Sequence, residues 1–523
     1  MLNIGKYEIN GTDNFDNYES YLETNLPDYN NYISKKDIFN IKEYLSDKCK
    51  CIVHEFPYYD KDFLSNYYEH YSLKYDNTDK RSLRLLFFAD AECEKLIGYI
   101  SFYNLKSNTH IGRMFINPKY IVGSKPQLIV SNHKVHLDGL EYFVECFPEI
   151  GSIEPYVCGH SAIWGVVRHR GHWYEYSSKT TNEISQYTPF EGNREKYFDG
   201  ITLKQISKVL YDLGFNPVER FSNLHTSQQQ ILKEVCVAID SKMPVILIVN
   251  KYNHAVVGVG YDGYFKASQL FQINDIMELD DDYIETLTIN KRTSVSLVQA
   301  ANLTKSIFVN DNNRLPYYCL KQNSYVIEKE ATETTTAENN KTEDNETKNY
   351  NMKNISAAIF PFYSRVNLNY IDVENLAKEE IVNIGEEIGW IKANSHNKIV
   401  MRIFMTSSNT YREYASKKLR FYDYQDLNYH IYNKIKYLEL PRFIWAVEIS
   451  KISEFDDSQV SGLILYDTTS SAKEKNSKLF VLGKNFMQYK NYNKVKKAKF
   501  NTSKDNKFNN KPFVLSRFTN NFE

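Results

Sequence analysis

The stretch PYVCGHSAIWGVV, residues 155 to 167, places one cysteine directly before a segment whose apolar residues have helical spacing. Pro155 interrupts the preceding chain, and Gly159 lets the backbone approach a neighbour closely. The inward face of the segment consists of Ala162, Ile163, Val166 and Val167. The pattern therefore predicts a helix that begins at Cys158 and packs on the body of the fold.

The position of Cys158 suits a nucleophile. The thiolate is the reactive form of cysteine, and both a helix N-terminus and a nearby imidazolium stabilise it. Cys158 meets the first of these two conditions on sequence alone. A buried structural thiol is the alternative, because free cysteines behave as small apolar residues and are common in protein cores.

Two more helices and a hairpin follow this segment. In ITLKQISKVLYDLG, residues 201 to 214, Thr202 and Gln205 are spaced as a capping box, and Gly214 marks the end of the helix. Residues 228 to 240 carry a second helical pattern. The runs MPVILIV (243 to 249) and HAVVGVGYD (254 to 262), separated by a short turn, predict two consecutive strands.

A histidine stands at the start of the second strand of this hairpin. His254 lies between two apolar runs, so a rigid sheet holds it, and from there it can lean over the end of a packed helix. The run SIFVNDNN (306 to 313) offers Asp311 as the first choice and Asn310 as the second for orienting the far ring nitrogen. Each residue also has an ordinary interpretation, because strand histidines are often only hydrogen-bonded and Asp-Asn-Asn is a turn signal.

Taken in order, these pieces resemble a known family. Phe147–Pro148, VCGHSAIW, the helix between Gly200 and Gly214, PVILIVNKYNHAVVGVGYD and FVND together resemble the papain-like cysteine peptidases. The likeness is closest to the branch with the bacteriocin-processing peptidase domains of transporters and their uncharacterised bacterial relatives. It covers roughly residues 143 to 320.

The resemblance implies an α+β fold with a papain-like core, in which an N-terminal catalytic helix packs on an antiparallel sheet flanked by β-rich α+β segments. It implies that Cys158 attacks, His254 carries the proton and Asp311, or Asn310, orients the imidazole. One departure stands out. The family places a glutamine amide about six residues before the cysteine to bind the oxyanion, and Ser152 occupies that position here.

The remaining sequence divides the chain into further regions. Residues 328 to 354 almost lack aromatic and branched apolar residues, which predicts a disordered linker rich in acidic residues, Thr and Asn. The expected organisation is an N-terminal α+β region with a sheet (1–140), the papain-like catalytic domain (141–327), the linker (328–354), a C-terminal α+β domain (355–490) and a basic flexible tail (491–523).

Composition narrows the function classes. The 64 Lys and Arg residues nearly balance the 65 Asp and Glu residues, which gives no strong case for nucleic-acid or membrane partners. No apolar run spans a bilayer and no signal peptide opens the chain, so we expect a soluble, cytoplasmic protein. We expect no cofactor and no metal, because Cys49, Cys51 and His54 lack a second ligand pair. The histidines of SNHKVHLDG and RHRGHW, His133, His136, His169 and His172, are expected to be exposed loop residues.

The resulting hypothesis is a papain-fold thiol hydrolase, a selective cysteine peptidase acting on a protein or peptide, most simply one specific partner protein. Two alternatives remain open. A catalytically decayed scaffold or binding protein on the same fold would account for Ser152, and a thiol acyltransferase would keep the nucleophile but change the acceptor.

Overall fold

The computed structural model places strands and helices along most of the 523 residues. No helix among the described residues is long and apolar enough to cross a membrane. The described residues are 3–9, 15, 17–26, 28–69, 72, 78–105, 111–123, 126–151, 157–174, 178–188, 200–222, 227–249, 254–277, 283–321, 352–418, 432–471, 477–483, 486–491, 494–499, 515–519 and 521.

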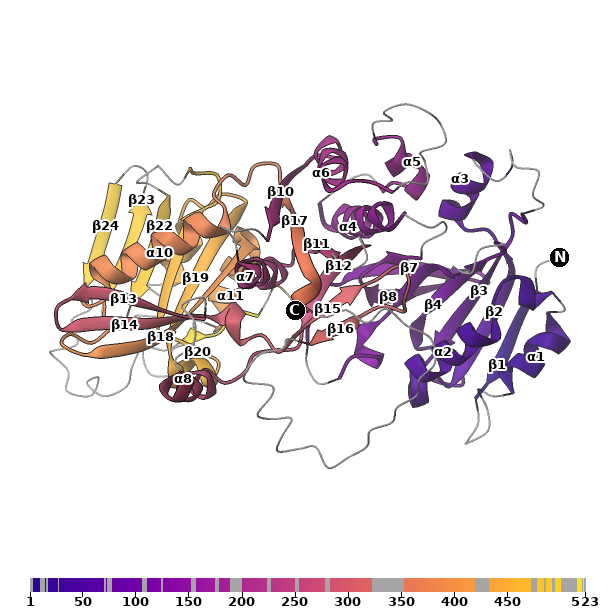
Figure 1. Cartoon of the computed structure of the whole chain (residues 1–523), viewed down its shortest axis with the longest axis horizontal. Coiled ribbons are helices and arrows are strands. Elements are labelled where there is room, and N and C mark those ends of the chain that lie inside the picture. The colour runs from indigo at the N-terminus through magenta and orange to yellow at the C-terminus, as the bar shows by residue number, and fades with distance from the viewer. Residues whose placement is uncertain are drawn as a thin grey trace.

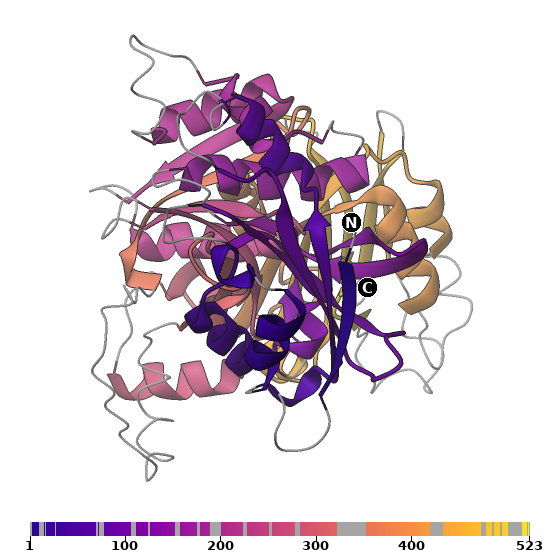
Figure 2. The same cartoon turned by 90° about the vertical axis from the view of Figure 1, so that its right-hand side faces the viewer.

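Mixed α and β elements form three large sheets that follow one another along the longest axis of the molecule (Figure 1). The N-terminal sheet has the strand order β1 (Asn3–Glu8), β2 (Cys51–Tyr58), β3 (Ser82–Phe88), β4 (Leu96–Tyr103), β5 (Ile111–Ile116) and β9 (Glu149–Ile150). Strands β3 and β4 are buried throughout, as expected for their continuous apolar runs. The helices of this region are α1 (Tyr18–Asn25), α2 (Lys35–Leu45) and α3 (Lys61–Glu69). Figure 2 shows these elements in front of the rest of the chain.

The central sheet carries the predicted hairpin. Its order is β10 (Phe215–Phe221), β17 (Ile355–Tyr363), β11 (Val245–Val249), β12 (His254–Tyr261), β15 (Ser306–Asn310) and β16 (Tyr318–Lys321), and β6 (Gln127–Leu128) pairs with the end of β12. All of these pairings are antiparallel. The register of the hairpin places Val249 opposite His254, so the histidine stands at the mouth of the β11–β12 connection.

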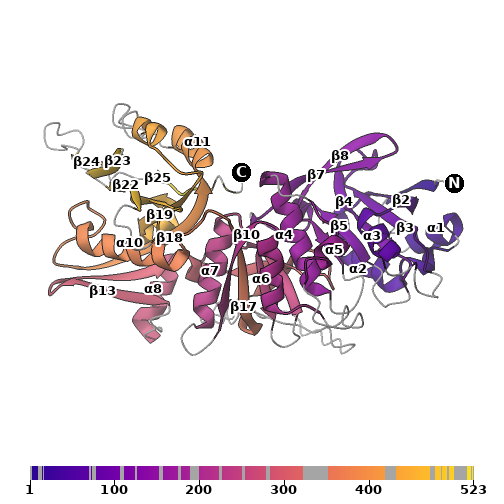
Figure 3. The same cartoon turned by 90° about the horizontal axis from the view of Figure 1, so that it is seen from above.

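Helices cover this sheet along one side (Figure 3). They are α4 (Cys158–Tyr174), α5 (Thr181–Ser185), α6 (Leu203–Asp212) and α7 (Gln228–Asp240). Both elements of the predicted capping box are present in α6, where Thr202 caps the backbone of Gln205 and Gln205 reaches back to Thr202. Gly214 adopts a φ of 95°, the left-handed conformation that ends helices.

Helix α4 contacts β12 directly and also contacts α6. A Cβ atom on Gly159 would lie 2.6 Å from Ile201, so only glycine permits this approach. The packed face contains Ala162, Ile163, Val166 and Val167, all of them buried as the helical spacing predicts.

The C-terminal sheet has the order β13 (Ile284–Asn290), β14 (Thr293–Gln299), β18 (His396–Ser407), β19 (Phe443–Lys451), β21 (Gly462–Asp467), β22 (Lys478–Gly483), β23 (Phe486–Asn491) and β24 (Lys494–Lys499). Smaller pairs are the hairpin β7 (Ser131–Leu137) with β8 (Leu140–Cys146), and β20 (Gln459–Val460) with β25 (Leu515–Ser516). The helices here are α8 (Ala267–Met277), α10 (Tyr370–Ile384), α11 (Ser408–Lys418) and α13 (Ile452–Asp456).

The sheets interleave across the expected domain boundary. Strand β17, at the start of the expected C-terminal domain, lies between β10 and β11 in the central sheet, and β13 and β14 join the C-terminal sheet, where β14 pairs in parallel with β18. Residues 328 to 351 of the expected linker lie outside the described residues. The regions on either side of that stretch are therefore not separate units of folding.

The end of the chain differs from the expected basic flexible tail. Residues 494 to 499 form β24 against β23, and Phe518 and Asn521 are buried. Phe518 stacks on Phe404, with ring centroids 4.8 Å apart, and Asn521 donates to backbone oxygens of Asp240 and Met405. These apolar and hydrogen-bonded contacts anchor a segment whose high lysine content suggested a solvated one.

A buried ionic cluster joins the central helix α7 to the C-terminal sheet. Arg402, on β18, donates to both carboxylate oxygens of Asp240 at 2.9 and 3.1 Å and to Glu448 at 3.0 Å. All three side chains are only 5 % exposed. The same guanidinium also donates to the backbone oxygen of Phe518 at 2.7 Å, which ties the chain end to the cluster.

Replacing Arg402 with methionine is expected to lower the free energy of unfolding by about 3–5 kcal/mol, because two carboxylates then stay buried without their counter-charge. Urea unfolding followed by fluorescence measures this loss. The exposed pair Lys208–Asp212 is the matched control, and Lys208→Ala is expected to cost less than about 0.5 kcal/mol. A loss below about 1 kcal/mol for the Arg402 variant would show that the cluster does not stabilise the junction.

Candidate active site

Cys158 is the first residue of α4, and it is only partly exposed. The helix begins in the expected way, because Ser161 N–H bonds to the backbone oxygen of Val157 at 3.0 Å. Backbone N–H groups of Ala255 and Gly159 donate to the sulfur. The thiol therefore faces the first residues of β12, the strand against which α4 packs.

His254 and Cys158 meet across the interface of helix and sheet. The two side chains interact, and each shifts the pKa of the other toward the charged form. One ring nitrogen, Nε2, lies 2.7 Å from Asp311 Oδ1, which leaves Nδ1 for the thiol. His254 is 11 % exposed and Asp311 3 %, so the imidazole reaches solvent while its carboxylate partner does not.

Asp311 follows β15 and is held by several neighbours. Its Oδ1 also accepts from Asn313 N–H at 3.0 Å, and its Oδ2 lies 3.4 Å from Arg314 Nε. Asn310, the second choice, does not face the histidine. Its Oδ1 instead accepts from Tyr317 N–H at 3.1 Å, which fixes the loop that carries Asp311.

The N-terminal region supports the same loop. The Tyr317 hydroxyl accepts from Phe147 N–H and donates to the backbone oxygen of Ile116. Tyr44, on α2, donates to the backbone oxygen of Pro316 at 3.1 Å. The position of Asp311 therefore depends on residues far outside the segment that holds the other two side chains.

The electrostatics favour a thiolate–imidazolium pair. Burial alone would raise the pKa of the Cys158 thiol, but the hydrogen bond from His254, the backbone donors and the imidazolium charge lower this pKa below its usual value. Burial likewise opposes a charged imidazole, yet the hydrogen bonds and charges of Asp311 and Cys158 raise the pKa of His254 to about 9. The ion pair is stable between these two pKa values.

A second histidine lies close in sequence but takes no part. His160 is buried, and burial lowers its pKa to about 4, so its ring is neutral at physiological pH. Its Nε2 lies 3.5 Å from the Thr188 hydroxyl, at the edge of hydrogen-bond distance. The partner of Cys158 is thus the histidine 96 positions away rather than the one two positions away.

Searches of protein-family models, curated proteins and solved structures found no significant match to this chain. The function of the protein is therefore inferred from the geometry of the site. Among the residues that the structure describes, no three His, Cys, Asp or Glu side chains come together in a way that could hold a metal ion.

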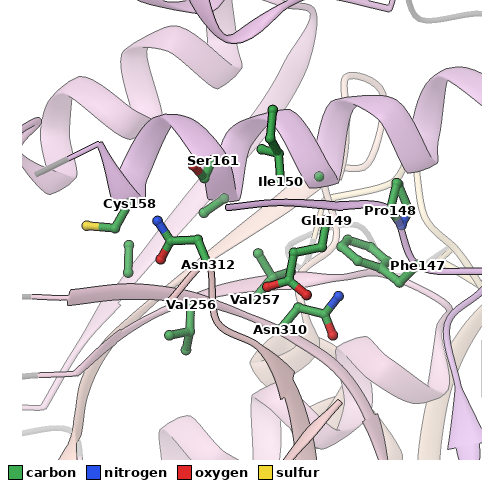
Figure 4. Close-up of a pocket in the computed structure, with 13 residues that line it drawn as sticks. Phe147, Pro148, Glu149, Ile150, Cys158, Ser161, Val256, Val257, Asn310 and Asn312 are labelled. Atoms are coloured by element: carbon green, nitrogen blue, oxygen red, sulfur yellow. The ribbon is translucent and has the colours of Figure 1, made fainter. Parts of the chain in front are cut away.

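A small pocket lies beside Cys158, between α4 and the strands β12 and β15 (Figure 4). Its polar side chains include Glu149, Asn310 and Asn312, which are 5 %, 3 % and 8 % exposed. The pocket is about large enough for one water molecule, because the centre of a water-sized sphere can occupy about 10 Å³ of it. The walls are the apolar groups Phe147, Pro148, Ile150, Ala162, Gly165, Ala255, Val256 and Val257.

Sequence reasoning missed two of these polar residues. Glu149 was hidden because β9 is only two residues long, and Asn312 because the Asp-Asn-Asn cluster also signals a turn. The periodicity of apolar residues in the sequence does not indicate that these two residues are buried, because both lie next to apolar segments without belonging to a periodic face. Ser152, at the expected oxyanion position, lies outside the described residues.

Two other expectations change with the structure. His169 is not an exposed loop residue, because it is buried on α4 and its Nδ1 lies 3.1 Å from the Ser131 hydroxyl. His133 is half-buried and bonds to the same hydroxyl through Nε2. Trp164, which follows the cysteine on α4, is buried and donates to Asp62 at 3.0 Å, so it packs in the core.

Proposed function

We propose that this protein is a thiol hydrolase with a papain-like core, acting as a selective peptidase. The single observation that carries the proposal is the arrangement of Cys158, His254 and Asp311 at the end of a helix packed on an antiparallel sheet, in which the histidine interacts with the thiol and hydrogen-bonds to the aspartate. The order of these residues along the chain, Cys then His then Asp, agrees with the resemblance described above. Ion pairs with a purely structural role also shift pKa values, so the proposal is tested through the reactivity of Cys158.

In the proposed reaction the Cys158 sulfur attacks the carbonyl carbon of a peptide bond, and the carbonyl π electrons move to its oxygen. When the tetrahedral intermediate collapses, the carbonyl re-forms and the C–N bond breaks, and His254 gives its proton to the leaving amine. Water, deprotonated by His254, then attacks the thioester and releases the acid and the thiol. Asp311 keeps the imidazole oriented and stabilises its positive charge throughout.

The flanking regions support selectivity. The N-terminal region holds the loop of Asp311 through Tyr44 and Ile116, and β17, from the expected C-terminal domain, lies in the sheet of the site. A degradative enzyme gains nothing from such dependence, whereas a protein that recognises one partner can couple recognition to the site. The protein or peptide substrate is therefore proposed to be a specific partner.

The test is alkylation of single cysteines by iodoacetamide in reducing buffer, followed by peptide mass spectrometry. At about pH 6 Cys158 is expected to react at least about tenfold faster than Cys319, because the imidazolium keeps a thiolate population at Cys158. Cys319 is an internal control, since it is exposed and makes no side-chain hydrogen bond within the described residues. Greater exposure alone would favour Cys319.

The pH dependence of the two reactions gives a second test, because hydrolysis and alkylation should respond differently to high pH. Because the pKa of His254 is raised to about 9, the imidazolium is lost as pH rises through that value. Hydrolysis of a peptide amide, whose leaving amine must be protonated, is then expected to fall above about pH 9 for want of a proton donor, whereas alkylation of Cys158 should not fall, because the thiolate remains. Slow, Cys319-like alkylation of Cys158 at all pH values would favour the decayed scaffold, and transfer of the acyl group to an added amine would favour the acyltransferase.

A further inference from the structure

The proposed reaction needs a donor for the oxyanion, and the family position for that donor holds a serine. A helix N-terminus supplies one N–H, from Cys158 itself, but a side-chain amide usually supplies the second. The pocket beside Cys158 contains such an amide in an unusual state. Within the described residues, neither Nδ2 nor Oδ1 of Asn312 has a hydrogen-bond partner, although both atoms are buried.

A buried carboxamide without partners costs about 1–3 kcal/mol for each unsatisfied group, so its presence calls for a reason. Asn312 immediately follows Asp311, and its side chain enters the pocket that Cys158 also lines. Figure 4 shows the amide directed toward the Cys158 end of the pocket, with Ser161 above it. The free space beside it suits one oxygen atom, because it holds about one water molecule.

We propose that Asn312 is a catalytic residue that donates a hydrogen bond to the oxyanion formed on Cys158. This inference rests on the proposed thiol hydrolase function and adds a residue to it. The free space beside the amide, about large enough for one water molecule, is the position that the oxyanion oxygen would take during the reaction. Either orientation of the amide is open, since rotation about its last bond exchanges nitrogen and oxygen.

The other polar residues of the pocket suggest how the Asn312 amide is oriented. Glu149 has no hydrogen-bond partner at either carboxylate oxygen within the described residues, and Asn310 has none at Nδ2. Burial and the charge of Asp311 raise the pKa of Glu149 well above its usual value, so this carboxyl stays protonated and can donate. A neutral Glu149 that donates toward Asn312 Oδ1 leaves Nδ2 free for the oxyanion.

Two reagents separate this role from a structural one. Acylation by p-nitrophenyl acetate passes through an oxyanion: the sulfur attacks the carbonyl carbon, the π electrons move to oxygen, and collapse expels p-nitrophenolate to leave a thioester. Alkylation by iodoacetamide forms the S–C bond as iodide leaves, and it creates no oxyanion. Both reactions use the same Cys158 thiolate.

In Asn312→Leu the rate of acylation at Cys158 is expected to fall by about 10²–10³-fold, whereas alkylation stays close to wild type. The leucine keeps the volume and removes only unsatisfied polar groups, so the unfolding temperature should hold or rise. Asn312→Asp keeps the shape, replaces the N–H donor by an oxygen, and is expected to lose at least as much acylation. Asn132→Leu makes the same change at an exposed position on β7 and is the matched control, with acylation near wild type.

Both rates are read at Cys158 by peptide mass spectrometry on the full chain, and unfolding temperature is measured for each variant. Unchanged acylation in Asn312→Leu, or an equal fall of acylation and alkylation, would overturn the assignment, because an oxyanion donor affects only the first reaction. A wild-type Cys158 that is inert to both reagents would remove the proposed function itself, and this inference with it.

Discussion

Replacing Cys158 with alanine is expected to reduce ester hydrolysis to the uncatalysed background, a loss of on the order of 10³-fold or more. The reason is that the Cys158 thiolate, stabilised by His254, is the nucleophile of the first step, and without it no thioester forms. Hydrolysis of p-nitrophenyl acetate, followed by release of p-nitrophenolate, measures the effect. Cys158→Ser tests the same point with less change in shape, since a hydroxyl is a far weaker nucleophile at this position.

The chain offers good controls for this experiment. Cys319→Ala and Cys93→Ala remove the exposed and half-exposed thiols that could also react with the ester. Both variants should keep wild-type turnover. Turnover that persists in Cys158→Ala and disappears with Cys319 would contradict the assignment and attribute the activity to an unassisted surface thiol.

Replacing Asp311 with alanine should lower kcat/KM by on the order of 10²–10⁴, because the imidazole then loses the group that orients it as a proton carrier. Asp311→Asn is expected to lose less, since an amide oxygen still accepts from Nε2 but carries no charge. In both variants the pKa of His254 should fall below about 9, because the carboxylate supports the imidazolium. The alkaline limb of the amide-hydrolysis profile should move to lower pH accordingly.

Asn310→Ala is the matched control for Asp311. Asn310 bonds to Tyr317 N–H rather than to His254, so its loss should loosen the loop and reduce stability without moving the alkaline limb. If the limb moved in Asn310→Ala and stayed in place in Asp311→Ala, the roles of the two residues would be exchanged. Histidine NMR on the same proteins gives an independent reading of the pKa.

Local patterns predicted much of what builds the site. The capping box of Thr202 and Gln205, the end of α6 at Gly214 and the β11–β12 hairpin are as the sequence indicates. These features depend on neighbours in the chain, which is why they can be recognised there. The contact of His254 with Asp311 was also predicted, and it forms because Asp311 directly follows β15, which pairs with the strand β12 that His254 begins.

The long-range features could not be predicted in the same way. The run ISAAIFPFY in β17 is uniformly apolar, so it suits the interior of either large sheet, and nothing local assigns it to the central one. Asn312 and Glu149 belong to no periodic pattern, and their burial arises only when β9, β15 and α4 meet. The chain end was misjudged because a few contacts of Phe518 and Asn521 outweigh a lysine-rich composition.

The placement of β17 bears on when this protein acquires activity during its synthesis. Cys158, His254 and Asp311 all leave the ribosome before residue 355, yet until then β10 and β11 each present an unpaired edge where β17 will insert. The nascent chain therefore carries all three reactive groups on an incomplete scaffold. If the proposed function holds, cleavage therefore waits until β17, residues 355 to 363, has been made and inserted between β10 and β11.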